Sequence, residues 1–135
     1  MLLNYKLNKP ADLIFDCLTN MTRFVALHPV IEKVNYLGND KFKIFETLKL
    51  GFIPISFTYP AVIESDYESK QVVMKAVVMK IAFIEMVFTI NEKYGYSIVE
   101  EQIKFKCALP IKSIMQQVFI KQHALLFKNI ENTIE

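Results

Sequence analysis

The last part of this chain, from Pro110 to Ile134, limits the possible folds more than any other segment. Its apolar residues recur at spacings of three, four and seven, which is the pattern of an amphipathic helix. They include Ile111, Met115, Val118, Phe119, Leu125 and Leu126. Projected at about 100° per residue, they cover an arc wider than the usual apolar stripe. A helix of this kind needs a partner that curves around it, and a strongly twisted antiparallel sheet has that shape.

The rest of the chain contains segments that alternate between apolar and polar residues. Near the start, Leu3, Tyr5 and Leu7 alternate with polar residues, as in a strand with one buried face. Further on, polar turns separate apolar runs, which predicts consecutive hairpins. The strands that we predict are Val34 to Leu37, Lys41 to Leu50, Ile53 to Glu64, Gln71 to Val78, Ala82 to Asn91 and Tyr96 to Cys107.

The connections between these strands differ in the strength of their turn signals. Gly51 to Pro54 is expected to form a turn or a bulge. Met79 to Ile81 contains no residue type that favours a turn, so the hairpin there is supported only by the pattern around it.

Two short helices are predicted between the first strand and the second. Pro10 fits the first turn of a helix, where a missing N–H costs nothing, and Asp12 complements the positive end of that helix. The stretch from Asn20 to Thr22 offers a cap for a second helix, which ends before His28 and Pro29.

Charge and hydropathy exclude several classes of protein. Sixteen basic and fourteen acidic residues give a net charge of +2, and the Lys and Arg residues form no cluster of the kind that nucleic-acid binders need. Met1 to Pro10 lacks the apolar core of a signal peptide, and the longest apolar stretch, Ala76 to Ile90, is interrupted by Lys80 and Glu85. We therefore expect a cytoplasmic protein with no nucleic-acid partner and no integral membrane association.

Neither of the two cysteines nor the histidines indicate a metal or a cofactor. Cys17 and Cys107 are far apart and have no neighbouring Cys or His, so we expect reduced thiols. His28 and His123 are the only imidazoles, and no Ser or Cys nucleophile accompanies them in a recognisable motif. We expect a capping or surface position for His28 and the flank of the helix for His123.

In element order and in three segments, the chain resembles the START and polyketide-cyclase superfamily, also called SRPBCC or birch-pollen-allergen-like proteins. The segments are KPADLIFDCLTNMTRFVALHPVIEKV, FTYPAVIESD and LPIKSIMQQVFIKQHALLFKNIE. The resemblance covers the whole chain, 1–135, as one domain. It implies an α+β helix-grip fold, in which a seven-stranded curved antiparallel sheet wraps around the long C-terminal helix and a hydrophobic cavity. Members of the superfamily include lipid carriers, quinone-binding chaperones, hormone receptors and aromatase or cyclase enzymes, so the resemblance specifies a fold rather than an activity.

Alternation along two strands places a carboxylate of each on the inner face of the sheet, which is the face toward the C-terminal helix. Glu46 shares a face with Ile44 and Leu48, and Glu101 shares one with Val99 and Ile103. A carboxylate in an apolar interior must be paired, hydrogen-bonded or neutralised, which gives each a possible polar role toward a ligand. The alternative is that a strand end or a bulge shifts the alternation and lets the side chain reach water.

Further candidates for ligand contact combine two polar side chains with six apolar ones. Tyr59 faces inward, and its buried phenol could orient a ligand carbonyl or hydroxyl. Gln122 lies near the centre of the apolar arc of the helix, where its amide contacts either a ligand or a residue of the sheet. The apolar candidates, any of which could instead be ordinary core, are Phe57, Met74, Met86, Phe88, Met115 and Phe119.

Three functions are compatible with these features. The first is binding or carrying a small hydrophobic molecule, such as a lipid, a quinone or a polyketide-like aromatic. The second is a cyclase or dehydrase in which Glu46 or Glu101 is the acid or base. The third is a protein-interaction module with a collapsed cavity, as a monomer or a homodimer.

Overall fold

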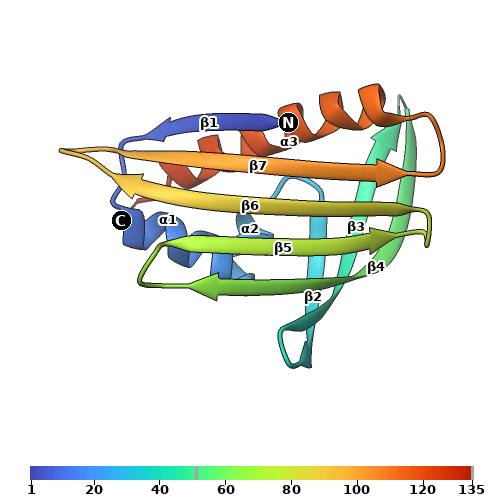
Figure 1. Cartoon of the computed structure of the whole chain (residues 1–135), viewed down its shortest axis with the longest axis horizontal. Coiled ribbons are helices and arrows are strands. Elements are labelled where there is room, and N and C mark those ends of the chain that lie inside the picture. The colour runs from blue at the N-terminus through green and yellow to red at the C-terminus, as the bar shows by residue number, and fades with distance from the viewer. Residues whose placement is uncertain (51, 135) are drawn as a thin grey trace.

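The computed structural model describes residues 1–50 and 52–134. Within them the chain forms, in order, β1 (Leu2–Leu7), α1 (Ala11–Thr19), α2 (Met21–Leu27), β2 (Ile31–Gly38), β3 (Lys41–Leu50), β4 (Ile53–Asp66), β5 (Gln71–Val78), β6 (Ala82–Glu92), β7 (Ser97–Cys107) and α3 (Lys112–Glu131). The predicted order of one strand, two short helices, six strands and a long helix is confirmed (Figure 1).

The strands form one antiparallel sheet in the order β1-β7-β6-β5-β4-β3-β2. Hairpins join all neighbours except the first pair, in which β1 lies beside β7 with Leu2 opposite Gln102. Figure 1 shows the sheet on one side of the molecule and the helices on the other, with α3 behind β1 and β7. α1 and α2 carry the chain from one edge of the sheet to the other, so the sheet can close over α3.

Several boundaries differ from the prediction by a few residues. β2 begins at Ile31 rather than Val34, because β3 is long enough to pair with it as far as Glu46. α3 ends at Glu131, since Asn132 caps it by donating its backbone N–H to the carbonyls of Lys128 and Ile130. The turn expected at Gly51 to Pro54 includes Gly51, which lies outside the described residues. None of the described helices is long and apolar enough to cross a lipid bilayer.

The connection after β5 has three residues, Met79 to Ile81, and contains no glycine. Met79 and Lys80 both adopt positive φ, 55° and 59°, and the N–H of Ile81 donates to the carbonyl of Val78 at 3.2 Å. This is the geometry of a type I′ hairpin turn, which matches the twist of the flanking strands. Asn39 and Asp40 also adopt positive φ after β2, and there the turn is predictable because Asn and Asp favour this conformation. The pairing of β5 with β6 holds Met79 and Lys80 in a conformation that costs each about 1 kcal/mol.

The inner face of α3 is rotated from the one that the apolar pattern predicts. Its buried residues are Phe119, His123, Leu126, Phe127 and Ile130, whereas Leu125 is 45% exposed. Phe127 stacks on Tyr5 of β1 with ring centroids 4.4 Å apart, which anchors the end of the helix to the edge of the sheet. His123 therefore occupies an inward position, which corrects its expected place on the flank of the helix.

Candidate ligand cavity

A cavity of about 280 Å³ lies between the sheet and α3. Nine of the ten predicted ligand contacts line it: Glu46, Phe57, Tyr59, Met74, Met86, Phe88, Met115, Phe119 and Gln122. The tenth, Glu101, does not reach the cavity, since it lies behind His123. The volume is near the lower end of the range for small-molecule sites, about 300–1,000 Å³. The structure thus gathers these residues around one space, and their contact with a ligand stays a prediction.

The cavity is apolar near its mouth and has its polar side chains deeper inside, beside apolar ones such as Phe88 and Leu126. Ile55, Met79 and Ile81 line it and are all exposed, so it opens where β3 meets β4 and β5 meets β6. His123 lies about 18 Å along α3 from Ile111, which also lines the cavity near the mouth, at about 1.5 Å of rise per residue. A ligand with one polar group would therefore place that group deep and its apolar part toward the mouth.

Tyr59 and Glu46 form a hydrogen-bonded pair on neighbouring strands. The Tyr59 hydroxyl donates to Oε1 of Glu46 at 2.8 Å. Burial raises the pKa of the Glu46 carboxyl, while the bond from Tyr59 and the nearby His123 act in the opposite direction. Burial, together with Glu46, raises the pKa of Tyr59 well above its usual value, so the phenol remains a donor. Oε2 of Glu46 is left for a ligand, as alternation along β3 predicted for an inward carboxylate.

Glu101 and His123 form a buried ion pair behind the cavity wall. Nδ1 of His123 lies 2.5 Å from Oε2 of Glu101, and the two residues are 4% and 0% exposed. The distance is that of an ion pair, but the ring nitrogen and the carboxylate are not aligned as a hydrogen bond. Neither carboxylate oxygen has another partner among the described residues. Since His123 lines the cavity, its other nitrogen, Nε2, is the one available to a ligand.

His28 lies beside this pair at the end of α2. Its Nδ1 accepts hydrogen bonds from the backbone N–H groups of Val30 and Ile31, both at 3.2 Å. Burial and the neighbouring His123 lower the pKa of His28 to about 3, so the ring is neutral at physiological pH. Because Nδ1 is an acceptor, the proton of the neutral ring is on Nε2. The ring centroids of His28 and His123 are 6.4 Å apart, and both residues line the cavity.

The two amides on α3 have different surroundings. Asn129 donates to the carbonyl of Leu27 at 2.8 Å and so fastens α3 to α2. Gln122 lines the cavity and has no hydrogen-bond partner among residues 1–50 and 52–134, so its amide is available to a ligand.

The polar end of the cavity is a compact set of acids, bases and donors. Along the chain the residues that line it are His28, Glu46, Tyr59, Gln122 and His123, and Glu101 lies behind His123. Within the described part of the chain, no three His, Cys, Asp or Glu side chains are placed to hold a metal ion. The set can exchange hydrogen bonds, and protons, with one polar group of a bound molecule.

A comparison with models of protein families finds no match, and neither does a comparison with curated protein sequences. Solved structures do match. A START superfamily protein from Mycobacterium smegmatis has a TM-score of 0.79 at 13% identity, covering 97% of this chain and 93% of that one.

Two aromatase/cyclase structures match as well. The di-domain ARO/CYC BexL from the BE-7585A biosynthetic pathway has a TM-score of 0.81 at 14% identity, over 97% of this chain and 46% of that one. The Zhui aromatase/cyclase from Streptomyces sp. R1128 has a TM-score of 0.71 at 11% identity, over 97% of this chain and 90% of that one. The chain therefore has the helix-grip fold of the START and aromatase/cyclase proteins, as its sequence segments indicated.

Proposed function

We propose that this protein binds and carries a small hydrophobic molecule that bears one hydroxyl or carbonyl group. The observation that supports the proposal is the polarity of the cavity, which is apolar from Ile55 and Met79 inward and polar around His123. A few polar groups at one end of an apolar site fix the orientation of a ligand. The observed volume also argues against an interaction module with a collapsed cavity.

The two imidazoles favour a hydroxyl or phenol as the polar group. Nε2–H of His28 is a donor, because Nδ1 accepts from Val30 and Ile31. With Nδ1 turned to Glu101, Nε2 is the nitrogen of His123 that faces the cavity. A ligand hydroxyl is both a donor and an acceptor, so it can accept from His28 and form a second hydrogen bond with Nε2 of His123, which an apolar analogue of the same shape cannot do.

Native mass spectrometry of freshly purified protein, followed by thermal shifts with matched ligand pairs, tests this function. A ligand at about 100 times its Kd stabilises a protein by about 2.7 kcal/mol, which a melt detects readily. We expect 1-naphthol to bind about ten-fold or more tightly than 1-methylnaphthalene, because the apolar analogue leaves both imidazoles without partners. If no lipophilic species co-purifies and no member of a lipid and polyphenol panel shifts the melting temperature, the carrier function is wrong.

Acid–base catalysis is a second candidate, favoured by the Glu101–His123 pair. A carboxylate behind an imidazole orients it and supports proton transfer at the other ring nitrogen. Glu46, with its raised pKa, is a proton donor on the opposite wall, and Tyr59 positions it. Glu101 itself is covered, so in a cyclase or dehydrase it would act through His123.

Proton exchange separates the two candidates. A catalyst should exchange the acidic carbon-bound protons of a bound 1,3-diketone with solvent deuterium faster than buffer does, which proton NMR measures. If the diketone is bound but its protons exchange at the rate seen in buffer, the protein is a carrier and the catalytic function is wrong.

A further inference from the structure

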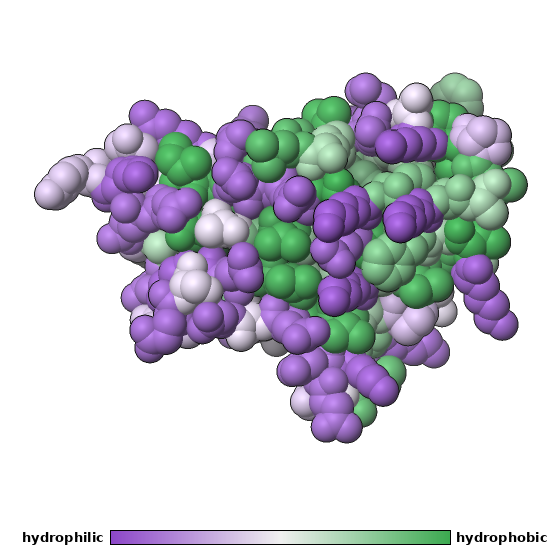
Figure 2. Space-filling view, viewed as in Figure 1, coloured by the Kyte–Doolittle hydropathy of each residue, from purple (hydrophilic) through white to green (hydrophobic). Residues whose placement is uncertain are grey.

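The cavity opens at an end of the molecule where large apolar side chains are in contact with water. We call Phe52, Ile53, Met79, Ile81, Leu109 and Ile114 the mouth rim; Phe52 is fully exposed and each of the others is at least 41% exposed. They come from the connections β3–β4, β5–β6 and β7–α3, from the first residue of β4 and from the first turn of α3. Figure 2 shows apolar surface gathered at this end. A group of exposed apolar residues around an opening marks a site of interaction.

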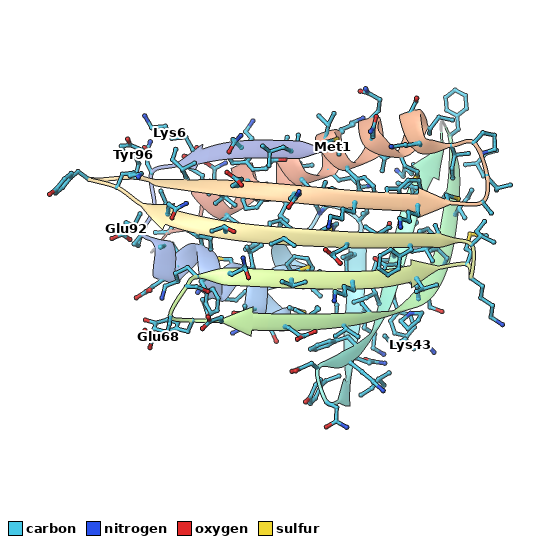
Figure 3. All side chains as sticks on the ribbon, in the orientation of Figure 1. Met1, Lys6, Lys43, Glu68, Glu92 and Tyr96 are labelled. Carbon is cyan, nitrogen blue, oxygen red and sulfur yellow. The ribbon has the colours of Figure 1, made fainter. Side chains whose placement is uncertain are left out.

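The charges around the mouth rim are all positive. Lys49, Lys80, Lys106 and Lys112 are exposed in the segments that form it, and residues 48–55, 77–83 and 105–114 contain no Asp or Glu. The opposite end carries both signs, including Lys6, Glu68 and Glu92 (Figure 3). The mouth therefore combines exposed apolar side chains with a positive potential.

Two of these lysines border a second, shallow hollow beside the mouth. Lys80 and Lys106 line it together with Val77, Ile81 and Phe83. Val77 and Phe83 are opposite each other on β5 and β6, and both are exposed on the outer side of the sheet. The hollow thus offers two ammonium groups above an apolar floor, which suits an anionic headgroup with an acyl chain below it.

From the charge and the exposed apolar groups together, we propose that the mouth rim docks on the surface of a lipid bilayer that contains anionic lipids. Apolar side chains with flanking lysines bind at the boundary between headgroups and acyl chains, and each lysine adds electrostatic attraction to anionic lipid. A second copy of the chain is a poor partner for this face, because a two-fold dimer would set lysines against lysines. Docking would place the opening of the cavity against the bilayer, so a hydrophobic ligand could pass between them without entering water.

Flotation with vesicles of phosphatidylcholine, with and without about one third phosphatidylglycerol, tests the proposal on the full chain. We expect binding to the anionic vesicles that falls with added salt, and weak binding to phosphatidylcholine alone. The Phe52→Ser/Met79→Ser variant should bind about ten-fold or more weakly, because two exposed apolar side chains are lost. Lys80→Gln/Lys106→Gln should lose about 25-fold, or about five-fold per lysine.

Matched variants at the opposite end are the controls. Tyr94 is also fully exposed, so Tyr94→Ser removes an equal aromatic side chain away from the mouth, and Lys93→Gln removes a nearby charge. Both should bind vesicles like the unchanged protein, and circular dichroism melts should show that all variants are folded. Docking is refuted if the protein does not bind anionic vesicles or if the rim variants bind them normally. It is also refuted if light scattering shows a dimer that the rim variants convert to a monomer while vesicle binding does not change. Thermal shifts with 1-naphthol report separately on the cavity, so docking and ligand binding can fail independently.

Discussion

Nδ1 of His123 on α3 lies 2.5 Å from Oε2 of Glu101 on β7, in a place that water does not reach. The pair joins the long helix to the sheet across the back of the cavity wall. Taking two charges out of water is costly, and their attraction offsets that cost only while both are present. The pair is therefore a weak source of net stability, although each partner depends strongly on the other.

Removing one partner should cost much more than removing both. We expect His123→Leu to destabilise the fold by about 3–5 kcal/mol, because it leaves a buried carboxylate unpaired. Glu101→Leu/His123→Leu should recover most of that loss, since two apolar side chains of similar size fill the space. Urea unfolding of the single and double variants measures the coupling; simple additivity would mean that the two groups do not interact. The double variant should also bind 1-naphthol and 1-methylnaphthalene with more nearly equal affinity.

Glu46 should lower stability near neutral pH. Its pKa in the folded protein is raised by burial, so the folded chain holds a proton that the unfolded chain has already released. Stability therefore falls as pH rises from about 4.5, the ordinary value, through the folded pKa, and the loss is complete above both. Glu46→Gln keeps an acceptor for Tyr59 and does not titrate, so it should be more stable than the parent at about pH 7 and equal to it near about pH 4. Glu64→Gln, at an exposed position on β4, should show no such difference in urea unfolding.

His28 should make the protein sensitive to acid. Its pKa is lowered to about 3 from 6.5, so in that interval the unfolded chain binds a proton that the folded chain does not. The stability that this provides is complete above about pH 6.5 and is lost as pH falls, by at most about 1.4 kcal/mol per pH unit. His28→Asn retains an oxygen acceptor for Val30 and Ile31 and removes the titration. Its free energy of unfolding should thus depend less on pH between about 6.5 and 3 than that of the parent. Identical slopes in the two proteins would contradict the assignment.

Filling the cavity should separate ligand binding from stability. Ala76 lines the cavity, so Ala76→Leu adds its side chain to empty space and should leave the melting temperature unchanged or higher. Ala11 is buried to a similar degree but does not line the cavity, so Ala11→Leu should destabilise by about 1–3 kcal/mol. Affinity for 1-naphthol, measured by calorimetry, should fall in Ala76→Leu. A large loss of stability in that variant would indicate that the space is filled.

Much of the fold could be predicted because local patterns and long-range pairing agree. Alternation and the polar turns together predicted all seven strands. Asn20 caps α2 as expected, accepting hydrogen bonds from the N–H groups of Thr22 and Arg23. The turn at Met79 and Lys80 could not be predicted from residue type, because neighbouring strands impose it. Strand ends such as Ile31 depend on the length of the partner strand, which a local pattern does not contain.

The site was predictable only in part. Alternation placed Glu46, Tyr59 and Glu101 on inner faces, since a strand has two sides and the apolar neighbours select one. On α3 the apolar arc is so wide that it does not define a single inner face, and apolarity alone favours Leu125 over His123, whereas Leu125 is exposed and His123 is buried. The inward position of His123 could have been inferred from Glu101. A buried carboxylate with no partner on the sheet needs a partner on the element that the sheet covers, and His123 is on that helix.

The pairing of β1 with β7 has a consequence for the order of events during synthesis. Leu2 lies opposite Gln102, so β1 is synthesised about 100 residues before β7, the strand that is its neighbour in the sheet. Until then its exposed backbone edge and the inner side chains Leu3, Tyr5 and Leu7 have no place to pack. Contacts this far apart in sequence form slowly. The arrival of β7, which pairs with both β6 and β1, should therefore complete the sheet that encloses the cavity.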